Sequence, residues 1–329
     1  MDKRGEPINL PGMRLTVADA RALTPEEKRQ LFLMRESVTY WKDAWRRFRK
    51  NRVAMAALAV IVLIALFAVV GPMLSPFAYD QQVRGAERLG PCLEHPFGTD
   101  QMGRDLMVRN MIGARVSLLV GLFCSVIVIV IGTLYGAYSG FKGGAVDNAM
   151  MRFLEVLYSV PELLFVILFQ IALKKPLNDL FPNATFGTAI ISIFIAFALL
   201  FWVNTARMVR GQVLVIKQQE YVTAARAMGA RTGRIIRRHL IPNCVGTILV
   251  TAMLQIPSAI FLESFLSFIG LGVSAPMASL GSLCSSALDS FESYPYRMFF
   301  PAAIISLIIL SFNLLGDGLR DALDPRLRS

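Results

Sequence analysis

Three glutamates lie inside long apolar stretches, where an ionised carboxylate is difficult to accommodate. Glu155 and Glu162 belong to one stretch and Glu263 to another. Because a charged group is unfavourable in hydrocarbon, such residues are candidates for a polar translocation path through a membrane. The alternative for Glu155 is an ion pair with Arg152, one helical turn earlier. Glu155 and Glu162 are seven residues apart, which predicts that they share one face of a helix.

Motifs of the common enzyme classes are missing from this sequence. The dipeptide Gly-Lys does not occur, so there is no phosphate-binding loop ending in Gly-Lys-Ser/Thr. The zinc-binding pattern HExxH, the nucleophile pattern Gly-x-Ser-x-Gly and a CxxC pair are also missing. We therefore predict that the chain is not an enzyme and holds no metal or cofactor. Any work against a gradient must use an ion gradient or another chain.

The elements around the three glutamates are expected to be membrane-spanning helices. Hydrophobic residues make up 55% of the 329 residues and charged residues 17%, whereas soluble domains carry about 25% charged residues. Six stretches reach the length of about 20 residues that a spanning helix needs. They lie at about 53–74, 116–138, 150–173, 186–206, 245–269 and 299–317. Because hydrocarbon offers no partner to backbone groups, the predicted fold class is an all-α integral membrane protein.

Positive charge predicts how these spans are oriented. Of the 34 lysines and arginines, 26 lie in the two tails and the alternate loops on their side, and 8 lie in the other loops. An even number of spans with this bias predicts a cell-membrane protein with both termini on the cytoplasmic side. The same rule explains the net charge of +11, so we predict no nucleic-acid partner.

The first 52 residues form a polar tail before the transmembrane domain at 53–329. Near its end, apolar residues recur at helical spacing among basic ones: Val38, Trp41, Trp45 and Phe48. This pattern predicts an amphipathic helix in the lipid headgroup layer, and the alternative is a solvated tail. In the second span, Gly132, Gly136 and Gly140 repeat every four residues, which predicts close helix packing.

Two cysteines are predicted to lie on the external side. Cys92 belongs to the first external loop and Cys284 to the third. A disulfide between them requires Cα atoms within about 7 Å of each other. The alternative is two unrelated free thiols, and the sequence leaves this choice open.

A basic stretch at 220–243 separates the fourth and fifth apolar segments, in a predicted cytoplasmic loop at 207–243. We expect two short helices joined at Gly229, where glycine permits a positive φ, with Pro242 ending the second. The first helix presents an apolar face of mostly small residues, formed by Tyr221, Ala224, Ala225 and Met228. The second presents a basic face, formed by Arg234, Arg237 and Arg238. Such a pair can dock into a groove of another protein, and the alternative is a solvated loop.

The basic stretch also carries a family resemblance. Glu220-x3-Ala224-Ala225-x3-Gly229, followed by Ile-Pro at 241–242, resembles the EAA loop of ABC importer permeases. Two departures from the family pattern are that Glu220 does not directly precede the alanine pair and that Ile-Pro replaces the usual Leu-Pro. Three further stretches resemble the oligopeptide and dipeptide branch: HPFGTDQMGRD at 95–105, SFLSFIGLG at 264–272 and FNLLGDGLRDALDPR at 312–326.

The resemblance covers the chain from about Trp45 to its end and implies a type I ABC importer permease fold. It implies a second, homologous permease, two cytoplasmic ATPases that bind the ATP, and an extracytoplasmic peptide-binding protein as partners. The coupling residues it implies are Glu220, Tyr221, Ala224, Ala225, Met228, Gly229 and Arg234. Relatives of this kind also move nickel chelates, glutathione or sugars, so these cargoes stay open. The alternatives from other classes are an ion-coupled secondary transporter and a membrane-embedded enzyme.

Overall fold

The structure, a computed structural model, describes residues 9–10, 13–14, 40–182, 188–273 and 276–323. It divides into two units, residues 1–46 and 47–329. In the first unit, β1 (Asn9–Leu10) pairs antiparallel with β2 (Met13–Arg14). Most of the predicted polar tail falls outside the described residues.

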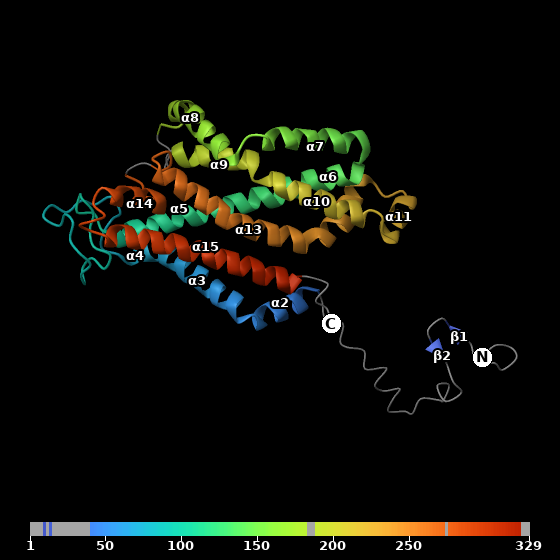
Figure 1. Ribbon diagram of the computed structural model, residues 1–329, viewed down its shortest axis with the longest axis horizontal. Coiled ribbons are helices and arrows are strands. Elements are labelled where there is room, and N and C mark those ends of the chain that lie inside the picture. The colour runs from blue at the N-terminus through green and yellow to red at the C-terminus, as the bar shows by residue number, and fades with distance from the viewer. Residues whose placement is uncertain (1–8, 11–12, 15–39, 183–187, 274–275, 324–329) are drawn as a thin grey trace. The chain divides into compact units, whose positions relative to one another are not determined.

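The larger unit is built almost entirely from helices, as the composition predicts. α3, α5, α13 and α15 pack side by side, and α6 packs against α10 (Figure 1). The helices among the described residues are α2 (Tyr40–Lys50), α3 (Arg52–Val69), α4 (Gly71–Leu74), α5 (Leu106–Ile127), the π-helical turn η2 (Val128–Gly132), α6 (Thr133–Lys142), α7 (Gly144–Tyr158), α8 (Glu162–Leu180), α9 (Thr188–Leu200), α10 (Trp202–Ile216), α11 (Glu220–Ala227), α12 (Thr232–Ile235), the π-helical turn η3 (Ile236–Leu240), α13 (Ile241–Phe268), α14 (Leu280–Leu288) and α15 (Tyr296–Leu323).

Five continuous helices among the described residues are long and apolar enough to cross a membrane. They cover 52–69, 106–142, 188–216, 232–268 and 296–323, and each contains most of one expected span. Several extend past the expected ends, because polar residues at the ends of an apolar stretch continue the same helix. The expected loop at 207–243 is therefore mostly helical, and only residues 217–219 and 228–231 lie between helices.

The expected third span at 150–173 is not one straight helix. α7 and α8 pass the criteria for a span only as a pair, and they meet at an angle of 77°. Pro161 lies at the junction; it has no N–H to donate and disfavours a helical conformation in the residue before it. The prediction that Glu155 and Glu162 share one helical face is therefore wrong, because the break separates them.

The glycine repeat brings α6 close to α10, as predicted. A Cβ atom at Gly136 would lie 2.3 Å from the carbonyl oxygen of Ala206, and one at Gly140 would lie 2.9 Å from that of Arg210. A Cβ atom at Gly132, in η2, would lie 2.9 Å from the Cβ of Thr205 and 3.0 Å from the carbonyl oxygen of Trp202. The absence of side chains at these positions allows the two backbones to pack in direct contact.

The basic helix predicted before the first span is present as α2. Trp41 and Trp45 are 51% and 54% exposed, whereas Phe48 is 3% exposed and packs against α3 and α15. Val38 lies outside the described residues. The position of α2 in a headgroup layer stays a prediction.

The disulfide considered between Cys92 and Cys284 is absent, since all four cysteines are free. Cys92 lies on an exposed loop, whereas Cys284 is buried in α14. Burial raises the pKa of the Cys284 thiol to about 11, so its reactive thiolate is scarce at neutral pH.

We therefore expect an aqueous maleimide at pH 7.5 to modify Cys92 and to leave Cys284 unmodified in the folded protein. Mass spectrometry of peptides from the labelled, non-reduced protein measures both sites. Cys92→Ser is the control, and it should abolish labelling of the loop before α5. Equal labelling of the two thiols, or a 92–284 disulfide peptide, would contradict this expectation.

Candidate functional site

Helix α11 ends in a glycine cap that turns the chain sharply. The N–H of Gly229 donates to the carbonyl of Arg226 (3.0 Å), and that of Ala230 donates to the carbonyl of Ala225 (3.1 Å). This pair of bonds defines a Schellman motif, which requires a left-handed residue after the helix. Gly229 has a φ of +78°, so the positive φ expected from the sequence is confirmed.

Several side chains of α11 pack against the neighbouring helices. Val222 is fully buried in an apolar cluster with residues of α10, α12 and α13, and Ala225 is also buried. The Arg226 guanidinium lies 5.0 Å from the centre of the Phe141 ring in α6. The ring of Tyr221 lies 6.2 Å from that of His239 in η3. These contacts join α11 to elements that continue into the long apolar helices.

The exposed face of α11 differs from the predicted face at one position. Tyr221, Ala224 and Met228 are exposed, and Met228 reaches 82% exposure. Ala225 faces inward, because it shares a helical face with Val222, three residues earlier. The apolar, β-branched Val222 was the sequence signal that could have identified this inward face.

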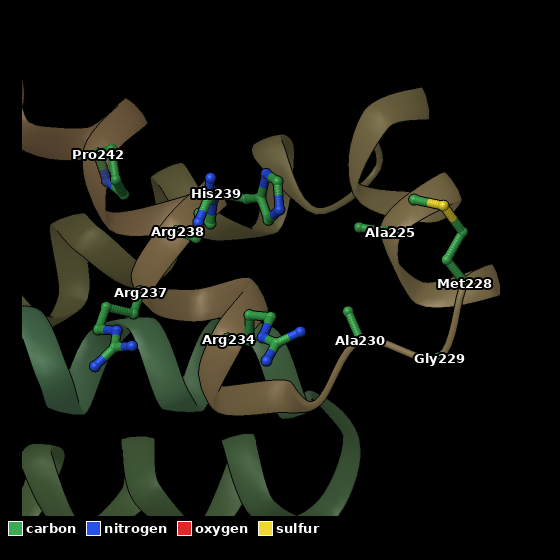
Figure 2. A pocket seen from close by; sticks show the side chains of 9 residues that line it. All are labelled: Ala225, Met228, Gly229, Ala230, Arg234, Arg237, Arg238, His239 and Pro242. Atoms are coloured by element: carbon green, nitrogen blue, oxygen red, sulfur yellow. The ribbon is translucent and has the colours of Figure 1, made fainter.

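A basic cleft of about 910 Å³ opens between α11 and the segment that follows it. Ala225 and Met228 lie on one side of it and most of the basic side chains on the other (Figure 2). None of the described residues that line the cleft is acidic, so an acidic partner surface would complement it. The lining residues are Ala225, Met228, Gly229, Ala230, Arg234, Arg237, Arg238, His239 and Pro242.

The second basic helix does not end at Pro242, as the sequence had suggested. Residues 232–268 form one continuous helix. Pro242 lies at the start of α13, directly after the π-helical turn η3, and the side-chain amide of Asn243 donates to the His239 carbonyl (2.6 Å). A π-helical turn shifts the hydrogen-bonding register and thereby accommodates the proline. The basic segment and α13 therefore form one continuous helix.

Of the three glutamates, Glu155 adopts the alternative arrangement. Arg152 Nη1 lies 3.0 Å from Glu155 Oε2, and both side chains are largely exposed on α7. Two cavities adjoin Glu162 at the start of α8, and Glu155 lines neither of them.

Glu263 lines neither of the two cavities beside the start of α8, and its place on a translocation path stays a prediction. It is fully buried within the chain, between α5, α13 and α14. Its carboxyl group accepts hydrogen bonds from Ser117 (3.0 Å), Ser267 (2.9 Å) and Ser264 (3.3 Å). Three hydroxyl donors replace the water that burial removes.

Glu162 is exposed, and its place on a translocation path also stays a prediction. As the first residue of α8, it lines two neighbouring cavities of about 590 and about 110 Å³. The larger cavity is walled by α8, α13 and α15, and the smaller by the α7–α8 break, the junction of α9 and α10, and α13.

Comparison with known proteins identifies the family. Residues 129–329 match the family described as "Binding-protein-dependent transport system inner membrane component", and residues 39–91 match "N-terminal TM domain of oligopeptide transport permease C". The chain belongs to this family of permeases.

No group of three or more His, Cys, Asp and Glu side chains that could hold a metal occurs among the described residues.

Curated relatives resemble this permease over nearly its whole length. It is 44% identical to the oligopeptide transport system permease protein OppC of Bacillus subtilis (strain 168), over 97% of this chain and 99% of the relative. The dipeptide transport system permease protein DppC of the same organism is 47% identical over 89% and 88%. OppC of Escherichia coli (strain K12) is 46% identical over 88% and 93%.

A solved structure of the MetNI methionine ABC transporter, described as inward facing, shares the fold of this permease. The TM-score is 0.52 at 16% identity, and the match covers 67% of this permease and 96% of that chain. This confirms the predicted type I ABC importer permease fold.

Two interactions between charged residues of the permease were not predicted from the sequence. Asp147 in α7 binds Arg210 in α10 through two contacts of 2.6 Å, and Ser139 also donates to its carboxylate. On the loop before α5, His95 Nδ1 lies 2.8 Å from Asp105 Oδ2, while the other oxygen of Asp105 caps α5 at Val108. The HPFGTDQMGRD stretch therefore contributes to a folded loop. Asp147 and Arg210 are 63 residues apart, and no spacing rule pairs them.

Proposed function

We propose that this permease is one transmembrane subunit of an ATP-driven importer that moves peptides into the cytoplasm. The observation that carries this proposal is the likeness, over nearly the whole chain, to relatives named oligopeptide and dipeptide transport system permease proteins. The bias of lysine and arginine supports a cell-membrane protein with both termini in the cytoplasm.

The same proposal assigns the missing functions to partner chains. Two cytoplasmic ATPases bind and hydrolyse ATP, a second homologous permease completes the path, and an extracytoplasmic peptide-binding protein delivers the cargo. The membership of this chain in a binding-protein-dependent permease family supports this division of labour. This permease then needs no nucleotide site, cofactor or catalytic residue of its own.

In this mechanism α11 transmits the movement of the ATPases to the spans. Its exposed Tyr221, Ala224 and Met228 enter a groove of the ATPase, and the basic cleft faces acidic groups there. Since α11 is packed against α10, α12 and α13, closure of the ATPases moves these helices as a body. The result is alternating access by rotation of packed helices.

The experiment is reconstitution of the permease with its partners in vesicles, followed by uptake of a radiolabelled tripeptide. We expect uptake only with ATP and with loaded binding protein. Uptake that follows a proton or sodium gradient without ATP would instead support an ion-coupled transporter.

A further inference from the structure

The cavities at the α7–α8 break have a chemistry unlike that of the basic cleft. Glu162 lines both cavities and is the one charged side chain among the described residues that line them. The other polar lining residues are neutral: Tyr158, Asn204, Gln255, Ser258 and Asn313. A negatively charged ligand would find no cationic partner there.

The position of the cavities suits a path through the membrane. Gln255 and Ser258 lie near the middle of α13 (Ile241–Phe268), and Asn313 lies in the central part of α15 (Tyr296–Leu323). Both helices are long enough to span a bilayer. Polar side chains at this depth are unfavourable unless they serve a pathway or a partner.

The lining groups together match a primary ammonium group. A carboxylate attracts the positive charge, and this attraction is stronger in surroundings of low dielectric constant. The amide and hydroxyl oxygens accept N–H bonds, of which an ammonium group donates three. Phe261 and Phe265 line the larger cavity, and the face of an aromatic ring also attracts a cation.

We propose that Glu162 holds the ammonium group of peptide cargo as it passes through the permease. This inference rests on the proposed function, since it concerns how the imported peptide is handled. The ammonium comes from the free α-amino group of the peptide or from a lysine side chain. The structure assigns to Glu162 a specificity that is separate from that of the external binding protein.

The test measures initial uptake rates of three tripeptides in reconstituted vesicles. One has a free α-amino group and no lysine, one is N-acetylated and contains lysine, and one is N-acetylated with norleucine in place of lysine. Each is supplied at a concentration that saturates the purified binding protein, as determined by a separate titration. Differences in rate then arise after delivery, within the permeases.

For the unmodified permease we expect the peptides that carry an ammonium group to move about tenfold faster than the neutral one, the effect of one charge-assisted hydrogen bond. Glu162→Gln should reduce this ratio to about one, because it removes the charge at nearly constant size. Glu162→Asp should retain part of the preference. The matched control is Glu155→Gln, which removes a carboxylate outside both cavities and should leave the ratio unchanged.

Preference for only the first peptide would assign the ammonium to the α-amino group, and preference for both cationic peptides would show that either source is held. An unmodified permease that moves all three equally, or a Glu162→Gln variant that keeps the preference, would overturn the inference while peptide import stands. Failure of the unmodified complex to import any of the peptides with ATP would instead count against the proposed function.

Discussion

Gly229→Val is expected to leave the permease folded and assembled but to weaken strongly the response of ATP hydrolysis to loaded binding protein. The φ of +78° at this residue is open to glycine and unfavourable for a branched side chain, by about 1–2 kcal/mol. Apart from Gly229 and its two chain neighbours, no atom lies within 4 Å of the position a Cβ would take, so the substitution acts through the backbone. To relieve the strain, the chain must change the angle between α11 and α12.

Peptide uptake should fall by about tenfold, as expected when roughly 1.4 kcal/mol of coupling is lost. Reconstituted vesicles measure uptake and stimulated ATP hydrolysis, and co-purification checks assembly. Gly233→Val is the matched control, since Gly233 also has open space around it but no positive φ. The control should behave nearly as the unmodified permease. Glu220→Ala should reduce coupling less than Gly229→Val, because an exposed charge contributes little.

Gly136→Leu is expected to prevent α6 from packing on α10 and to lower the yield of folded permease sharply. A Cβ atom at this position would lie 2.3 Å from the Ala206 carbonyl oxygen and 3.0 Å from the Ala206 Cα. Because the nearest atoms belong to the backbone, the helices must separate to admit a side chain. Overpacking of this kind costs about 1–3 kcal/mol or more.

The measurements for Gly136→Leu are the monodisperse fraction after detergent extraction and the midpoint of thermal unfolding. Both should fall relative to the unmodified permease. Gly211→Leu provides the control, because Gly211 lies in α10 but has no atom beyond its own stretch of helix within 4 Å of the position that a Cβ would take. An unchanged Tm in Gly136→Leu would show that the glycine repeat does not hold these two helices together.

Local sequence signals predicted the features of the fold that depend on short stretches. Long apolar runs located the spanning helices, and a glycine at the end of a helical pattern indicated the positive φ at Gly229. The break at Pro161 was missed although its signal was present, since apolar residues continue on both sides of the proline. Helix ends were also misplaced, because hydropathy marks the apolar part of a helix and not its hydrogen-bonded length.

The sequence predicted less of the site where contacts are distant along the chain. The pair Arg152–Glu155 follows from spacing on one helix. The serine hydroxyls around Glu263 include that of Ser117, which is 146 residues away in the sequence. The burial of Glu263 could therefore not be predicted. The orientation of Ala225 depends on which face of α11 meets the apolar cluster, and that is a tertiary choice.

The central claim, that the exposed end of α11 is the surface on which the ATPases bind, is tested most directly by labelling a Met228→Cys variant. Met228 is 82% exposed without partners, so an aqueous maleimide should react rapidly with the cysteine in the isolated permease. A Leu180→Cys variant is the control; this residue is 68% exposed and ends α8, a helix separate from α11. We predict that adding the ATPases protects the cysteine at position 228 and leaves labelling at position 180 unchanged. Equal labelling at position 228 with and without stably bound ATPases would contradict the claim.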